Sequence, residues 1–120
     1  MTPRFQPLVD YLARLPAVEA GIVSGTEDDL WWVKFGIDLD HPLAWHVIQE
    51  LGHVLNYLSP NERLPTAFKP VSPPPYLNGG PRDYLSWVIE CPRADMDPAT
   101  VAAWLDSRLS DPDDAGQWLA

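Results

Sequence analysis

Apolar and polar residues alternate along two segments of the chain, which is the pattern of half-buried β-strands. In LWWVKFGIDL (residues 30–39) the odd-numbered positions are all apolar: Trp31, Val33, Phe35, Ile37 and Leu39. In YLSWVIEC (residues 84–91) the apolar side consists of Leu85, Trp87, Ile89 and Cys91. Both segments predict strands that turn these side chains toward a core.

Two shorter stretches also predict strands. AVEAGIV (residues 17–23) alternates weakly, and the SGTEDD that follows it is typical of a turn. TAFKPV (residues 66–71) contains Pro70, which cannot donate a backbone hydrogen bond and therefore indicates an edge strand.

Three segments have the spacing of amphipathic helices, residues 4–14, 41–58 and 98–109. The central one follows Asp40 as a candidate N-cap, carries Pro42 in its first turn and ends before Ser59-Pro60. Its apolar arc is formed by Leu43, Val47, Leu51, Val54 and Leu58. We expect this arc to face the core.

The predicted element order is α-ββα-ββα. Helices that follow pairs of strands favour an α+β two-layer sandwich, in which a four-stranded, mostly antiparallel sheet carries its helices on one face, in a ferredoxin-like or related fold. The 120 residues predict a single domain, residues 1–120. Residues 110–120 are acidic and lack a period, so we expect a loosely ordered tail.

The charge balance excludes some partners and favours others. Seventeen acidic and eight basic residues give a formal net charge of −9, and no basic cluster offsets it. This charge opposes binding to nucleic acid and to anionic membranes, and it favours a basic protein partner. No apolar run is long enough to span a membrane or to form a signal peptide, and a single cysteine suits a reducing compartment, so we expect a cytoplasmic protein.

The sheet face that points away from the helices is the most informative candidate surface. Even-numbered positions of the two confident strands turn the following residues away from the helices: Trp32, Lys34, Gly36, Asp38, Tyr84, Ser86, Val88 and Glu90. The candidate binding residues among them are Trp32, Lys34, Asp38, Tyr84, Ser86 and Glu90. Exposed aromatic residues are enriched at protein interfaces, so this face predicts a binding surface. The alternative is that the amino-terminal helix or the tail folds across the face and buries it.

The proline-rich stretch KPVSPPPYLNGGPRD (residues 69–83) joins two predicted strands. Its prolines favour an extended path and Asn78-Gly79-Gly80 favours a sharp reversal, so we interpret it as a stiff connector. The same stretch contains the PPxY pattern of a WW-domain ligand, although a position between two strands argues against a free ligand. As a connector it would carry Tyr76 and Arg82 to the rim of the binding face.

The outer surface of the central helix offers a second contact. Trp45 lies opposite the apolar arc, close to Gln49 and Gly52 on a helical projection. A large ring beside a glycine predicts docking against a second copy, giving a homodimer, while an isolated exposed aromatic residue is also ordinary.

Metal binding and catalysis have weaker support. His46, Glu50 and His53 form one stripe on the central helix, but the two histidines lie about 10.5 Å apart along the helix axis, too far for one zinc ion. Only one histidine with Glu50 could share a metal, with other ligands supplied elsewhere. We expect no cofactor and nominate no catalytic residue, because no nucleophile, phosphate or dinucleotide motif is present.

Two hypotheses follow from the sequence. The first is a small acidic module that binds a protein partner, in the manner of an immunity protein or antitoxin, or binds itself, through the open sheet face. The second is a small-molecule or metal-binding domain, or an enzyme, with a site near residues 69–83 and the central helix.

Overall fold

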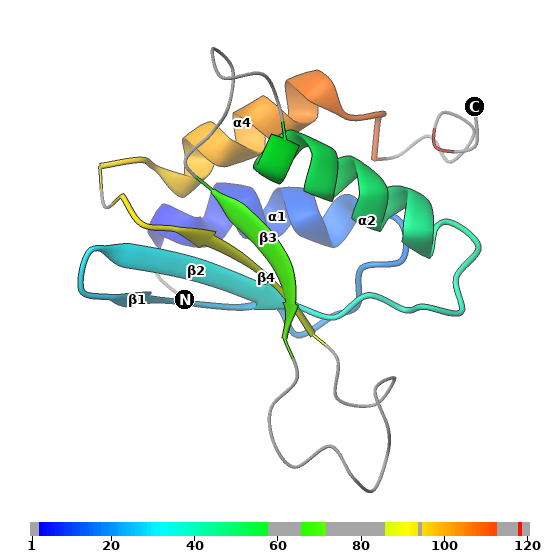
Figure 1. The fold of residues 1–120 in the computed structure, drawn as a ribbon, viewed down its shortest axis with the longest axis horizontal. Helices are drawn as coiled ribbons and strands as arrows, with labels where there is room; N and C mark the ends of the chain where they lie inside the picture. Colours follow the sequence, from blue (N-terminus) through cyan, green and yellow to red (C-terminus); the bar gives the residue numbers. More distant parts are fainter. Residues whose placement is uncertain (1–2, 58–65, 72–85, 94, 113–117, 119–120) are drawn as a thin grey trace, which may run out of the picture.

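The computed structural model describes residues 3–57, 66–71, 86–93, 95–112 and 118. In this part of the chain, three α-helices and a four-stranded antiparallel sheet form two layers (Figure 1), which confirms the predicted α+β sandwich. The elements in chain order are a 3₁₀ turn (Pro3–Phe5), α1 (Gln6–Arg14), β1 (Val23–Glu27), β2 (Leu30–Phe35), α2 (Ala44–Gly52), a π-helical turn (His53–Tyr57), β3 (Ala67–Val71), β4 (Ser86–Cys91) and α4 (Pro98–Arg108).

The strands are arranged in the order β1-β2-β4-β3, and each neighbouring pair is antiparallel. Strands β2 and β4 occupy the centre, where Val33 pairs with Ile89 and Phe35 pairs with Trp87. Strand β3 lies at one edge, as Pro70 predicted.

The first strand differs from the prediction. Residues 17–22 lie outside it: Val18 makes an isolated bridge to Ile37, and β1 begins at Val23, the last residue of the predicted strand. Most of the predicted turn SGTEDD is strand instead, because a two-residue reversal at Asp28-Asp29 pairs Glu27 with Leu30 and extends the hairpin back through Gly25. Pairing with β2 has overridden the poor β-propensity of these residues.

All three helices cover the same face of the sheet (Figure 1). The predicted alternation in β2 is confirmed, since Trp31, Val33 and Phe35 are at most 2% exposed. These side chains form one hydrophobic cluster with residues from every helix, among them Leu12 of α1, Leu51 of α2 and Leu105 of α4. The amino-terminal helix therefore lies on the core side of the sheet and does not cover the other face.

The central helix is shorter at its start than predicted. Helix α2 begins at Ala44, after a turn in which the backbone N–H of Asp40 donates to the Asp38 carboxylate and that of Leu43 donates to Nδ1 of His41. Most of the predicted apolar arc is buried as expected, including Leu43, Val47, Leu51 and Val54, whereas Leu58 lies outside the described residues.

The π-helical turn closes the outer edge of β3. The side-chain amide of Asn56 donates to the backbone carbonyl of Phe68 at 3.0 Å and accepts from its backbone N–H at 2.9 Å. The Thr66 hydroxyl also donates to the carbonyl of Leu55 at 3.1 Å. Asn56 thus satisfies the backbone groups that an edge strand would otherwise expose.

The carboxyl-terminal tail is described only in part, since residues 113–117 and 119–120 of the predicted segment 110–120 lie outside the described residues. The Trp118 side chain is buried, and its indole N–H donates to the backbone carbonyl of Asp111 at 3.0 Å. None of the helices in the described part of the chain is both long enough and apolar enough to cross a membrane.

We expect Tyr11→Phe to increase the free energy of unfolding at pH 7 by about 1 kcal/mol, because the Tyr11 hydroxyl is buried without a hydrogen-bond partner among the residues that the structure describes. Burial and, to a smaller extent, Asp106 raise the pKa of Tyr11 above its ordinary value of 10.0. Below about pH 10 the tyrosine is neutral in both the folded and the unfolded protein. Above about pH 10 it ionises in the unfolded protein first, so the wild-type protein loses stability as the pH rises. The gain from the substitution should therefore grow in alkaline solution.

Urea unfolding of both proteins between neutral pH and the onset of alkaline unfolding measures this difference. A lower stability of Tyr11→Phe at pH 7 would show that the hydroxyl has a stabilising partner.

Candidate binding surface

The sheet face opposite the helices carries one set of alternating side chains, which we call the open face. The register places these residues on it: Val23, Gly25 and Glu27 of β1, Leu30, Trp32 and Lys34 of β2, Ala67, Lys69 and Val71 of β3, and Ser86, Val88 and Glu90 of β4. None of the described helices lies against this face (Figure 1).

A hollow of about 400 Å³ crosses the open face and is open to solvent. All four strands contribute to its lining, which consists of Glu27, Leu30, Trp32, Lys34, Val71, Val88 and Glu90. Three of these residues, Trp32, Lys34 and Glu90, were predicted to form the binding face. The hollow therefore combines apolar side chains with carboxylates and an ammonium group.

The Trp32 indole lies across β1. A Cβ atom added to Gly25, which pairs with Trp32, would come within 2.6 Å of Cζ2 of the indole. A side chain at position 25 would therefore displace the ring, and glycine is required for this close approach. Trp32 remains half-buried, and so the ring presents part of its surface at the border between β1 and β2.

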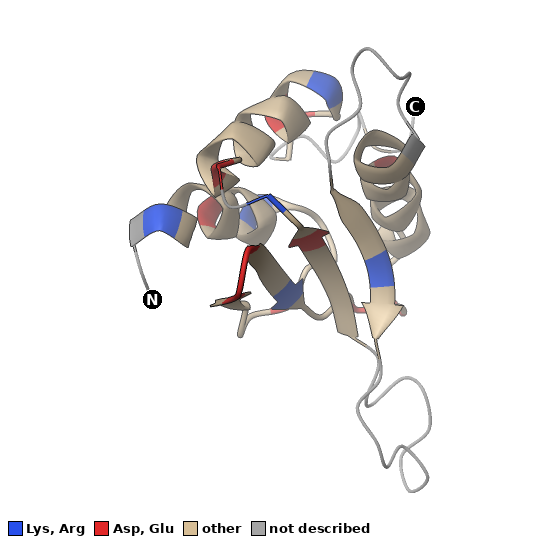
Figure 2. Ribbon diagram, turned by 60° about the vertical axis from the view of Figure 1, so that its left-hand side comes forward, with Lys and Arg blue, Asp and Glu red and all other residues tan. Residues whose placement is uncertain are grey.

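Charges of both signs lie on neighbouring strands of the open face (Figure 2). The ammonium group of Lys69 pairs with the Glu90 carboxylate at 2.8 Å. Lys34 forms no ion pair with any residue that the structure describes. Between the two lysines, and paired in register with both, lies Val88, which is 6% exposed. The centre of the face is thus apolar and its surroundings are charged.

The other predicted binding residues are placed differently. Ser86 lies on the open face but does not line the hollow. Asp38 is exposed in the turn before α2, where its carboxylate accepts the Asp40 N–H. Tyr76, Arg82 and Tyr84 fall outside the described residues, as does most of the connector at residues 69–83.

The self-contact predicted for α2 stays a prediction, and its three residues differ in exposure. Trp45 is 62% exposed and Gln49 is also exposed. Gly52 instead approaches β3, because a Cβ atom added to it would lie 4.0 Å from the Phe68 ring. Gly52 is half-buried on the side of α2 that faces β3, whereas Trp45 and Gln49 face solvent.

The candidate metal ligands His46, Glu50 and His53 are all exposed on the surface. Among the residues that the structure describes, no group of three or more histidine, cysteine or carboxylate side chains is arranged to hold a metal ion.

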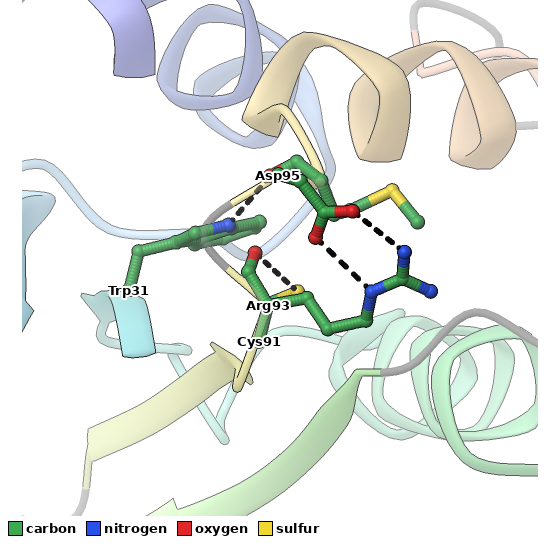
Figure 3. A network of polar contacts seen from close by, with 5 residues as sticks. Trp31, Cys91, Arg93 and Asp95 are labelled. Carbon is green, nitrogen blue, oxygen red and sulfur yellow. Dashed lines mark hydrogen bonds and ion pairs between the residues drawn. The ribbon is translucent and has the colours of Figure 1, made fainter. Parts of the chain in front are cut away.

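Polar contacts fix the segment between β4 and α4 (Figure 3). The Trp31 indole N–H donates to the backbone carbonyl of Met96 at 2.8 Å, and Arg93 forms two hydrogen bonds to the Asp95 carboxylate at 3.1 and 2.7 Å. The guanidinium of Arg93 lowers the pKa of Asp95. Burial raises the pKa of the fully buried Cys91, which disfavours the reactive thiolate.

Four residues line the hollow but were not among the predicted binding residues: Glu27, Leu30, Val71 and Val88. The alternation of β2 contains the signal for Leu30, which shares a side with Trp32. Glu27 lies in SGTEDD, whose composition is typical of a turn, so the sequence does not assign Glu27 to a face of the sheet.

Comparison with known proteins adds no assignment, because no family model, curated protein or solved structure matches the chain. The geometry of the open face is therefore the basis for a functional proposal.

Proposed function

We propose that this protein is an interaction module that binds a basic protein partner through the open face. The observation that carries the proposal is the position of the hollow, since every described helix lies on the other side of the sheet. A second layer of helices on the open face would bury Trp32. In this protein the Trp32 ring borders a hollow that is open to solvent.

The composition of the hollow supports a protein ligand. Leu30, Trp32 and Val71 are half-buried and provide apolar contact area, and Glu27, Lys34 and Glu90 provide charged groups around it. Interfaces commonly combine an apolar centre that contains an aromatic residue with a polar rim.

The net charge supports a basic partner. At −9, the protein attracts positively charged molecules over distances comparable to the Debye length, about 8–10 Å at physiological ionic strength. The carboxylate of Glu27 lines the hollow and has no described ion-pair partner, so it is suited to meet a cationic group of the partner.

Two charge reversals test the proposal. Glu27→Lys changes the hollow, while Glu50→Lys changes an exposed position on α2, and each raises the net charge by two, from −9 to −7. Immobilised protein is used to capture partners from an extract of the source cells at low ionic strength, and the affinity of each purified partner is then measured with both variants.

We expect Glu27→Lys to weaken binding by at least about tenfold and Glu50→Lys by less than about threefold, because only the first places a cation at the interface. Equal weakening by both variants would show that overall charge, rather than the open face, attracts the partner. The absence of any basic partner for the wild-type protein would refute the proposal.

A further inference from the structure

The two edge strands of the sheet, β1 and β3, differ in how many of their outward backbone groups are hydrogen-bonded. At the β3 edge, Asn56 bonds both backbone groups of Phe68, and Pro70, two residues further along the same edge, has no N–H to donate. At the β1 edge, the described residues supply no backbone hydrogen bond to β1 other than those of its ladder with β2. Within the described part of the chain, the β3 edge is therefore closed to a further strand and the β1 edge is open.

The register identifies the free groups of β1. A two-residue reversal makes Glu27–Leu30 a hydrogen-bonded pair, and such pairs alternate along an antiparallel ladder. Gly25 and Val23 therefore also bond to β2, whereas the N–H and C=O groups of Ser24 and Thr26 point away from the sheet. These four groups form a template for an added strand.

We propose that an extended, positively charged segment of the partner protein adds to β1 as a fifth strand. This inference rests on the proposed function, in which the partner is basic, and it specifies how that partner binds. Backbone hydrogen bonds to Ser24 and Thr26 would hold the segment, and its alternate side chains would extend the open face beyond β1.

Charge complementarity selects this occupant. Glu27, Asp28 and Asp29 are consecutive acidic residues at the end of β1, and together with Leu30 and Pro92 they line a second hollow of about 370 Å³. A basic side chain at the corresponding end of the added strand would be attracted to these carboxylates. A second copy of this chain, which is itself acidic, would gain less from the same position.

Trp32 provides a further contact for a cation. Its indole lies over Gly25, and Gly25 has no side chain to separate the ring from the side chain of an added strand at that level. A lysine or arginine there would meet the indole, and tryptophan is the aromatic residue most favourable for cation–π contact.

The probe for this mode of binding is a peptide of about nine residues that alternates arginine with threonine and is long enough to span β1 at about 3.3 Å per residue. A matched peptide with the same sequence and charge is N-methylated at every residue, so neither of its edges can donate a hydrogen bond. We expect the N-methylated peptide to bind at least about tenfold more weakly. Equal affinity would overturn strand addition and leave only charge attraction.

Ser24→Pro tests the protein side. Proline removes the outward N–H of position 24 without touching the ladder to β2, and edge strands tolerate proline in this orientation. Ser24→Ala keeps the N–H and is the matched control. We expect Ser24→Pro to weaken binding of the unmodified peptide at least about tenfold relative to Ser24→Ala; equal binding by the two variants would overturn the inference.

Hydrogen exchange of the wild-type protein provides an independent readout if Ser24→Pro does not fold. Saturation with the unmodified peptide should slow exchange of the Ser24 and Thr26 amides at least about tenfold, and unchanged exchange at both amides would overturn the inference. Sedimentation tests a second occupant. If the wild-type protein is a dimer and Ser24→Pro is a monomer, the added strand comes from a second copy of this chain, and the inference of a basic segment is wrong.

Binding of the captured partner to the two variants distinguishes binding through the open face from strand addition at β1. If Glu27→Lys loses the partner while Ser24→Pro keeps it, strand addition is wrong and binding through the open face stands. If both variants keep it, both proposals are wrong.

Discussion

Replacement of Trp31 by alanine is expected to lower the free energy of unfolding by about 3–5 kcal/mol, which is the range for truncation of a large buried aromatic residue. Trp31 is 1% exposed in a central strand, and its ring packs edge-to-face against Phe5 with the ring centroids 5.9 Å apart. Its indole N–H donates a hydrogen bond to the Met96 carbonyl. The variant loses all of these contacts. Because domains of this size are stable by only about 5–15 kcal/mol, it should unfold at low urea or fail to fold.

Trp45→Ala is the matched control, since it removes the same side chain from a position that is 62% exposed. Its effect on urea unfolding should stay within about 0.5 kcal/mol. Comparable losses for the two variants would contradict the assignment of Trp31 to the core and of Trp45 to the surface.

Asn56→Ala is expected to lower the free energy of unfolding by about 2 kcal/mol, because two partly buried backbone groups of Phe68 lose their hydrogen-bond partner at once. The substitution should also open the β3 edge, which favours association through exposed strand groups. Urea unfolding measures the first effect, and light scattering of the folded variant as a function of concentration measures the second.

Gln49→Ala, an exposed substitution on α2, should leave both properties unchanged. A stable, monomeric Asn56→Ala variant would indicate that water replaces the amide and that Asn56 does not protect the edge.

Hydrophobic alternation was sufficient to predict the central strand and its two faces. The burial of Trp31, Val33 and Phe35 follows directly from their spacing, because side chains in a strand alternate between faces. The position of β1 could not be predicted in the same way, since SGTEDD has the composition of a turn. Its strand conformation depends on pairing with β2 and on the Trp32 ring that covers Gly25, which are both tertiary contacts.

The residues of the hollow on the open face were predicted to a similar extent. Trp32, Lys34 and Glu90 were identified from alternation alone and lie together in the hollow. The difference between the two sheet edges requires the strand order and the Asn56 contact. Neither can be inferred from local spacing, because they join residues that are distant in sequence.

The most direct test of the central claim, that the open face and its β1 edge form the partner surface, is titration of isotope-labelled protein with the arginine–threonine peptide while backbone amide and indole resonances are recorded. We expect the shifts to be concentrated in β1 and at Trp32 and Lys34, with the amides of α2 and α4 unchanged. Shifts confined to the helices, or spread evenly over the acidic surface, would contradict the claim.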